Sequence, residues 1–165
     1  MSVIAYIALG SNLDDPANHV RRACQELGAL PQTCCLQYSC LYQSTPHGPT
    51  EQPDYINAVA ELETALPPNE LLSMLQALEK SHGRVRTGEH WGPRPLDLDI
   101  LLYGDQQIDG PDLQIPHPYM AERSFVLYPL SELVSELNIP GYGALSDLLQ
   151  SCPAEGLEPL NDLYN

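Results

Sequence analysis

The order in which strand-like and helix-like segments follow one another constrains the fold of this chain more than any other feature of its sequence. Apolar residues recur with helical spacing over residues 16–27 and 68–82. Short apolar or alternating runs typical of strands occupy residues 3–9, 34–42, 55–63 and 96–102. The resulting order, strand, helix, strand, strand, helix, strand, is that of the ferredoxin-like βαββαβ plan. We therefore predict an α+β domain with a mainly antiparallel sheet and helices on the outside.

The rest of the chain predicts smaller additions to this core. Residues 106–108 and 113–115 predict an extra hairpin, and short helical stretches follow as far as residue 149. We expect the tail after Ser151 to be coil. No linker, internal repeat or low-complexity segment divides the sequence, so residues 1–165 are expected to form a single domain.

Charge and cysteine content limit the partners of the chain. Its formal net charge of −15 repels nucleic acid and anionic membranes, so neither is an expected partner. No apolar run approaches the roughly 18 residues of a membrane span, and no signal peptide is visible. The five cysteines, an odd number without a Cys-x-x-Cys pair, favour reduced thiols and a cytoplasmic location. No long apolar stripe is left unassigned, which favours a monomer.

A pair of aspartates lies in the last of the predicted core strands. Leu96, Leu98 and Ile100 take one parity of the alternation, so Asp97 and Asp99 point together to the opposite surface. At about 3.3 Å per residue the two carboxylates stand roughly 7 Å apart, and such a pair persists most readily beside cations. Mg²⁺ is usually held by one or two carboxylates together with substrate phosphates. An edge strand with two solvated aspartates is the alternative for an isolated pair of this kind.

Positive charge gathers immediately before these aspartates. The chain has only seven lysine and arginine residues, and Arg84, Arg86 and Arg94 are three of them. Arginine concentrated beside metal-binding carboxylates is typical of a polyphosphate site. Arginines that merely solubilise a loop are the alternative, although so acidic a surface hardly needs them.

Aromatic residues predict a second part of the same site. The single tryptophan, Trp91, lies in the arginine-bearing segment, and the single phenylalanine, Phe125, lies two residues after Arg123. With Tyr55 they can form a slot for a flat heterocycle, and Asn57 can donate to and accept from its polar edge. Alternatively, Phe125 and Tyr55 are plain core residues.

Longer motifs surround all of these residues. They are YIALGSN at residues 6–12, QPDYINA at 52–58, GRVR at 83–86, GPRxxDLDI at 92–100 and PH at 116–117. Together they resemble the signature of the 6-hydroxymethyl-7,8-dihydropterin pyrophosphokinase family. The likeness extends from residue 3 to about residue 133 and includes rare residue types at fixed positions.

The resemblance implies an activity, two Mg²⁺ ions and a set of site residues. Members of the family transfer the pyrophosphoryl group of ATP to the hydroxymethyl group of a reduced pterin, releasing AMP, in folate biosynthesis. Carried over by motif, the catalytic residues are Arg84 and Arg94, which act on the transferred phosphates, and the metal ligands Asp97 and Asp99. The implied ATP contacts are Gln76, Glu79, Arg86, Ile100, His117 and Arg123. The implied pterin contacts are Ser44, Thr45, Pro46, His47, Tyr55, Asn57, Trp91 and Phe125.

The sequence departs from the family pattern at three positions. Pro118 stands where many relatives carry a tyrosine that contacts the nucleotide, and Thr87 and His90 stand where basic residues are common. Nucleotide affinity and loop charge can therefore differ from those of other members. The segment 83–92, with three glycines, further predicts a lid that closes over the substrates and excludes water.

Two other functions fit part of the pattern. A nucleotidyltransferase would share Gly10-Ser11, the Asp-x-Asp pair and two-metal chemistry, although most of a ferredoxin-like unit separates the two motifs in this chain. Its product differs, because a nucleotidyltransferase releases pyrophosphate where a pyrophosphokinase releases AMP. A regulatory domain of the same fold would bind a small molecule without depending on Mg²⁺.

Overall fold

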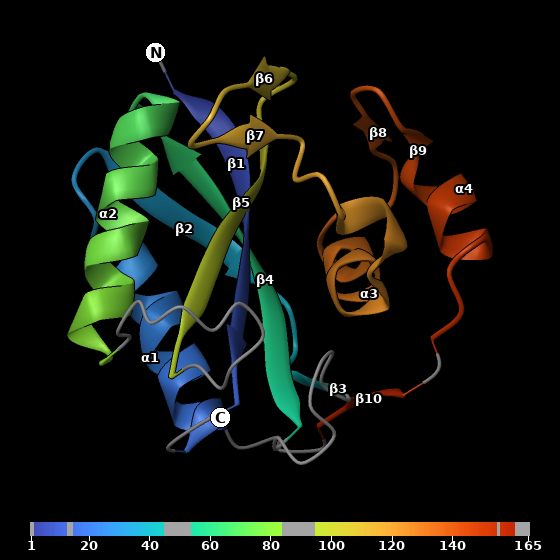
Figure 1. Ribbon diagram of the computed structural model, residues 1–165, viewed down its shortest axis with the longest axis horizontal. Helices are drawn as coiled ribbons and strands as arrows, with labels where there is room; N and C mark the ends of the chain where they lie inside the picture. The colour runs from blue at the N-terminus through green and yellow to red at the C-terminus, as the bar shows by residue number, and fades with distance from the viewer. Residues whose placement is uncertain (1, 13–14, 45–53, 84–94, 155, 161–165) are drawn as a thin grey trace.

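The chain folds into an antiparallel sheet with helices on both faces (Figure 1). The structure is a computed structural model that describes residues 2–12, 15–44, 54–83, 95–154 and 156–160. Its helices are α1 (Pro16–Leu27), α2 (Pro68–Ser81), η1 (Met120–Glu122), α3 (Ser124–Leu133) and α4 (Leu145–Gln150). The strands of the main sheet are β1 (Val3–Ser11), β2 (Thr33–Tyr38), β3 (Tyr42–Ser44), β4 (Tyr55–Thr64), β5 (Asp97–Tyr103) and β10 (Leu157–Pro159).

The strand order identifies the fold. The sheet runs β10-β3-β4-β1-β5, and β2 also pairs with β4, beyond β3 along the same edge. Every one of these pairings is antiparallel. Taken as one interrupted strand, β2 and β3 complete the ferredoxin-like order, in which β1 and β4 occupy the centre. The predicted α+β class and its βαββαβ core are therefore confirmed.

Two apolar layers explain why the central strands are buried on both faces. On one face Ile7 and Leu9 of β1 belong to a cluster with Leu27 of α1 and with Leu71 and Leu75 of α2. On the other face β1 and β5 contribute to a second cluster, which includes Tyr6, Leu101, Met120, Leu127 and Leu130. Figure 1 shows α1 and α2 on one side of the sheet and α3 and α4 on the other. The continuous apolar run at residues 3–9 corresponds to this double burial.

Two short hairpins lie outside the main sheet. The expected hairpin forms between β6 (Ile108–Asp109) and β7 (Gln114–Ile115). A second pair, β8 (Asn138–Ile139) and β9 (Gly143–Ala144), lies where only helical turns were expected. None of the helices in the described ranges combines the length and apolar character needed to cross a membrane.

Two expectations about strands are corrected. The tail after Ser151 is not all coil, because β10 pairs with the outer edge of β3, with Leu157 opposite Ser44 and Pro159 opposite Tyr42. The strand expected over residues 34–42 is broken, because the hydroxyl of Ser39 takes the place of a backbone carbonyl group in accepting the N–H of Val59, and β2 ends at Tyr38. Both features depend on pairing with distant residues, which local alternation does not report.

Candidate active site

A pocket opens where β1 ends and where β4 and β5 begin, beside the start of α3. Its empty space, counted together with the open mouth, is about 740 Å³. Eight of the residues implied by the sequence line it: Ser44, Tyr55, Asn57, Asp97, Asp99, His117, Arg123 and Phe125. The other lining residues are Ala8, Leu9, Gly10, Leu101 and Val126. Strands and a helix that are distant in sequence therefore bring the predicted polar and aromatic groups to one cavity.

Asp97 and Asp99 stand at the start of β5, which pairs with β1 along the sheet. Asp97 is opposite Gly10 and Asp99 is opposite Ala8, while Leu98 between them is buried in the core toward α1 and α2. Both aspartates line the pocket, as their shared parity predicted, and the Asp99 side chain is 37% exposed. The two carboxyl groups are therefore accessible from the cavity.

A buried glutamate holds the peptide between these aspartates. Oε2 of Glu79, on α2, accepts a hydrogen bond from the backbone N–H of Leu98 at 2.8 Å. Among the described strands, β5 is the edge of the sheet and its outward N–H groups have no strand partner, so Glu79 satisfies that of Leu98. Glu79 and the buried Ile100 do not line the pocket, nor does Gln76, and their contacts with ATP remain predictions.

His117 lies beside Asp99 in a neutral form. Its Nδ1 accepts a hydrogen bond from the N–H of Tyr119 at 3.2 Å, so the proton of the neutral ring is on Nε2. Nε2 lies 3.9 Å from Oδ2 of Asp99. Burial and the nearby charge of Arg123 lower the pKa of His117 to about 4, against the opposing effect of Asp97. At neutral pH the imidazole thus presents an N–H toward the carboxylates without adding a charge.

Arg123 provides positive charge on the α3 side of the pocket. Its guanidinium carbon lies 5.3 Å from the ring centre of Tyr119 and 5.5 Å from that of Phe125. Contacts of this kind with aromatic faces are attractive and restrict the side chain. Among the described residues that line the pocket, Arg123 is the only arginine or lysine.

The opposite wall is built from β3 and β4. Asn57 is buried and donates a hydrogen bond from Nδ2 to Oγ of Ser44 at 2.6 Å. Tyr55 pairs with Ser44 in the register of the two strands and also lines the cavity. Gly10 allows β1 to approach closely, because a Cβ atom there would lie 3.3 Å from Oδ1 of Asn57.

A glutamate at the end of α3 anchors that helix to β3. Glu132 accepts hydrogen bonds from the N–H of Cys40 at 3.0 Å and from the hydroxyl of Tyr42. Burial together with this carboxylate raises the pKa of Tyr42 above its ordinary value. The contact holds the helix that carries Phe125 against the strand that carries Ser44.

Several predicted site residues lie outside the described ranges. These are Thr45, Pro46, His47, Arg84, Arg86, Trp91 and Arg94, together with most of the segment expected to form a lid. Other residues of the pocket had not been singled out. Gly10 had a signal in the motif at residues 6–12, although no role in the site was assigned to it. Ala8 and Val126 had none, because both are ordinary apolar residues.

The donor set limits which metal the site can hold. In the part of the chain that the structure describes, no group of three or more His, Cys, Asp or Glu side chains is arranged to hold a metal ion. Asp97 and Asp99 are two carboxylates on one accessible wall. Such a set fits Mg²⁺, which takes few protein ligands and completes its octahedron with water and phosphate oxygens.

Comparison with known proteins gives the family. The family model described as 7,8-dihydro-6-hydroxymethylpterin-pyrophosphokinase (HPPK) matches residues 6–135. A 2-amino-4-hydroxy-6-hydroxymethyldihydropteridine pyrophosphokinase of Pseudomonas aeruginosa is 49% identical over 155 residues, covering 94% of this chain and 95% of the relative. The protein of the same name from Haemophilus influenzae is 44% identical over 159 residues, covering 96% and 99%.

Solved structures agree at the level of the fold. A structure of Plasmodium falciparum HPPK-DHPS with pteroate superposes with a TM-score of 0.71 at 14% identity, covering 92% of this chain and 42% of that one. A further HPPK-DHPS structure in complex with substrates gives a TM-score of 0.66 at 13% identity, covering 92% and 43%. By its sequence match over most of its length, this chain belongs to the 7,8-dihydro-6-hydroxymethylpterin-pyrophosphokinase family.

Proposed function

We propose that the pocket beside β5 is the centre at which this chain transfers the pyrophosphoryl group of ATP to 6-hydroxymethyl-7,8-dihydropterin. The products are AMP and the pyrophosphorylated pterin, in the folate pathway of the family. One observation carries the assignment: two accessible carboxylates and an aromatic, amide-bearing wall face the same cavity. A polyphosphate with its metal and a flat heterocycle can therefore lie side by side.

Asp97 and Asp99 are the proposed ligands of two Mg²⁺ ions. Bound Mg²⁺ would supply neutralisation of the negative charge on the triphosphate and on the transferred group. The two carboxylates act by fixing position, because β1 and the Glu79 hydrogen bond hold the strand that carries them. His117 directs its Nε2–H toward this region and Arg123 adds a positive charge, so both can contact phosphate oxygens.

The pterin is proposed to bind against β3, β4 and α3. Phe125 and Tyr55 present aromatic rings to the pocket, which suits stacking with a flat bicyclic ring. The amide of Asn57, with Nδ2 held by Ser44, is available to the polar edge of the heterocycle. Within the family pattern, the backbone of Thr45, Pro46 and His47 and the ring of Trp91 complete this subsite.

The remaining ATP contacts follow from the family pattern. Arg84 and Arg94 are proposed to stabilise the charge that develops on the transferred phosphates, as positioned arginines do in phosphoryl transfer. Arg86, Gln76, Glu79 and Ile100 complete the proposed nucleotide site. The incoming hydroxyl group then needs positioning in line with the attacked phosphorus more than it needs a strong base.

A monomeric enzyme of the cytoplasm is proposed with this function. The five cysteines, an odd number without a Cys-x-x-Cys pair, favour reduced thiols and a reducing compartment. The net charge of −15 further opposes close self-association at low salt.

Product analysis tests the proposed reaction. The full chain is incubated with ATP, Mg²⁺ and 6-hydroxymethyl-7,8-dihydropterin, and nucleotides and pterins are separated by chromatography. We expect AMP and pyrophosphorylated pterin in equal amounts, and neither product without Mg²⁺. Release of inorganic pyrophosphate would instead indicate a nucleotidyltransferase. Pterin binding that needs no Mg²⁺ and yields no product would indicate a regulatory domain.

A further inference from the structure

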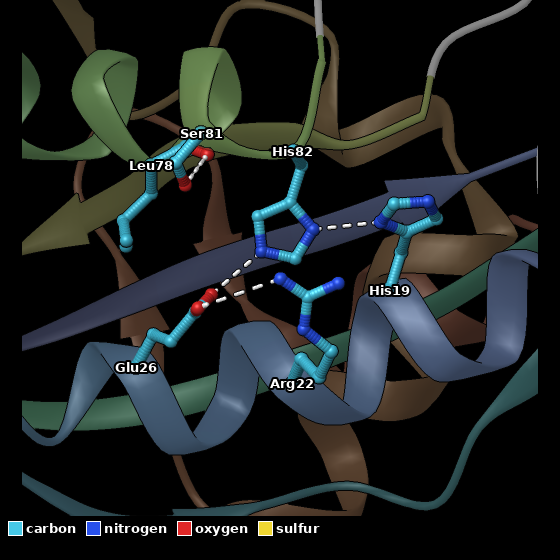
Figure 2. A network of polar contacts seen from close by, with 6 residues as sticks. All are labelled: His19, Arg22, Glu26, Leu78, Ser81 and His82. Carbon is cyan, nitrogen blue, oxygen red and sulfur yellow. Dashed lines mark hydrogen bonds and ion pairs between the residues drawn. The ribbon is translucent and has the colours of Figure 1, made fainter.

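His19 of α1 meets His82, the residue that directly follows α2 (Figure 2). Nδ1 of His82 lies 2.7 Å from Nδ1 of His19, and Nε2 of His82 lies 2.6 Å from Oε1 of Glu26. The His82 side chain is 0% exposed, whereas His19 and Glu26, both on α1, are partly exposed. On the outer side Nη2 of Arg22 lies 3.9 Å from the other oxygen of Glu26.

The two contacts determine where protons can lie. A carboxylate only accepts hydrogen bonds, so Nε2 of His82 carries a hydrogen. In the neutral pair His82 therefore has a lone pair on Nδ1, and His19 donates its Nδ1–H to it. One added proton is accommodated, because a single N–H still lies between the two rings and Glu26 balances the charge. Two added protons would place two N–H groups head to head at 2.7 Å, which no hydrogen bond permits.

The same turn of α2 reaches β5. His82 follows directly on the last residue of the helix, and its N–H bonds to the carbonyl groups of Leu78 and Glu79. Glu79, three residues before His82, accepts the hydrogen bond from the N–H of Leu98. One end of this turn is thus bound to α1 through the histidine pair, and the other is bound to the strand of Asp97 and Asp99.

We propose that a proton shared between His19 and His82 clamps the last turn of α2 to α1 and thereby positions Glu79 on the peptide between Asp97 and Asp99. Acidification that gives both imidazoles a proton opens the clamp. His82 and His19 are then positioning residues, and their effect on catalysis rests on the function proposed above for the two aspartates.

The charged groups around the pair set the direction of the effect. On α1 they are Glu26, which faces Nε2 of His82, and Arg22, which pairs with Glu26. On α2 they are Glu79, already bonded to Leu98, and the exposed Lys80. On β5, the strand packed against α2, Asp97 faces the pocket instead. Glu26 is therefore the carboxylate that balances the first proton, and a second proton brings two N–H groups face to face between the rings. Opening therefore follows acidification, because it needs a second proton on the pair.

Substitution at the partly exposed His19 tests the clamp without disturbing the buried ring. In His19→Asn the side-chain nitrogen takes the place of Nδ1, and it can bond to His82 but cannot gain a charge. In His19→Ala the contact is lost at every pH. Lys80→Gln, an exposed change in the same turn of α2, is the matched control.

The readout is the hydrogen-exchange protection of the Leu98 amide in the ligand-free full chain, corrected for the intrinsic pH dependence of exchange. We expect protection to fall about tenfold in the wild type between pH 7.5 and 5.5, and in Lys80→Gln equally. His19→Ala should show that loss already at pH 7.5, and His19→Asn should keep protection across the range. Protection that is independent of pH in the wild type, or equal in His19→Asn and His19→Ala, would overturn the clamp.

A parallel measurement of kcat/KM separates the clamp from the proposed active site. We expect kcat/KM of His19→Ala at pH 7.5 to fall about tenfold with the protection, since small displacements of positioned groups are costly. Lost protection with unchanged kcat/KM would uphold the clamp and contradict the role given to Asp97 and Asp99.

Discussion

The amide of Asn57 and the hydroxyl of Ser44 form a 2.6 Å hydrogen bond between two adjacent strands at the wall of the pocket. Both side chains are buried, so the bond fixes the amide on the aromatic side of the cavity. A fixed amide discriminates between heterocycles because a mismatched edge leaves a buried polar group unpaired.

Asn57→Ala should weaken pterin binding about 100-fold. The substitution removes the amide from a buried site, and the hydroxyl of Ser44 then faces a methyl group instead of its hydrogen-bond donor. Ser44→Ala should weaken it about tenfold, since the amide remains but loses its anchor. Pterin titration by fluorescence or calorimetry measures both effects. Equal affinities in the wild type and Asn57→Ala would remove Asn57 from the pterin site.

Gly10→Ala should weaken pterin binding about tenfold through a steric effect. The new Cβ atom would lie 3.3 Å from Oδ1 of Asn57, so the amide must shift. Gly110→Ala is the control, because its Cβ atom would meet only the carbonyl oxygen of Leu113 at 3.5 Å. Thermal unfolding checks that both variants fold. A Gly10→Ala protein with wild-type pterin affinity would show that the close approach of β1 has no role in recognition.

His117 should remain neutral in the ligand-free chain down to about pH 5, because burial and Arg123 lower its pKa to about 4. An exposed imidazole titrates near pH 6.5, so the unfolded chain takes up this proton first. Stability is therefore fully present above about pH 6.5 and is lost as the pH falls toward 4, by about 3 kcal/mol at pH 4.

NMR titration of the His117 ring measures this directly, and urea unfolding at pH 7 and pH 4.5 measures the stability. Arg123→Gln should raise the pKa of His117, since it removes one of the two lowering causes. His117→Gln should reduce the loss of stability on acidification. A His117 ring that titrates near pH 6.5 would be incompatible with the environment described.

Removal of β10 should loosen the strand that carries Ser44. In a chain shortened to end at Ala154, the outer edge of β3 loses its partner, including the pairing of Leu157 with Ser44. We expect the free energy of unfolding to fall by about 1–2 kcal/mol, as a few hydrogen bonds are lost, and pterin affinity to fall severalfold. A chain that ends at Leu160 keeps β10 and is the matched control. Identical behaviour of the two shortened chains would deny β10 a role in the site.

The parts of the site that sequence could predict are those set by local periodicity. Alternation at residues 96–102 placed Leu98 in the core and both aspartates on one surface, because side-chain direction along a strand is purely local. The order of the core elements likewise followed from the sequence, because apolar residues recur about every 3.6 residues in helices and every second residue in strands. The pocket unites Asp97, Asn57 and Phe125 because the ferredoxin-like order makes β5 and β4 flank β1.

The parts that sequence could not predict depend on contacts between distant residues. A three-residue strand containing Pro159 has no period to detect, so β10 was taken for coil. The sequence implied Glu79 only as a contact of ATP. It gave no sign that the carboxyl group of Glu79 accepts a hydrogen bond from the N–H of Leu98 at the edge of β5. The pairing of His19 with His82 is invisible for the same reason, since it depends on how α1 and α2 pack against one sheet.

The most direct test of the central claim is the rate of AMP formation by Asp97→Asn and Asp99→Asn at saturating ATP, Mg²⁺ and 6-hydroxymethyl-7,8-dihydropterin. Asparagine keeps the size of the side chain and removes its charge, so the fold and the binding of pterin alone should be preserved. We expect kcat to fall about 1,000-fold in each variant, the scale of losing one electrostatic group at a reaction centre. A rate within a few-fold of wild type in either variant, with the fold intact, would contradict the assignment of these two carboxylates to Mg²⁺ and ATP.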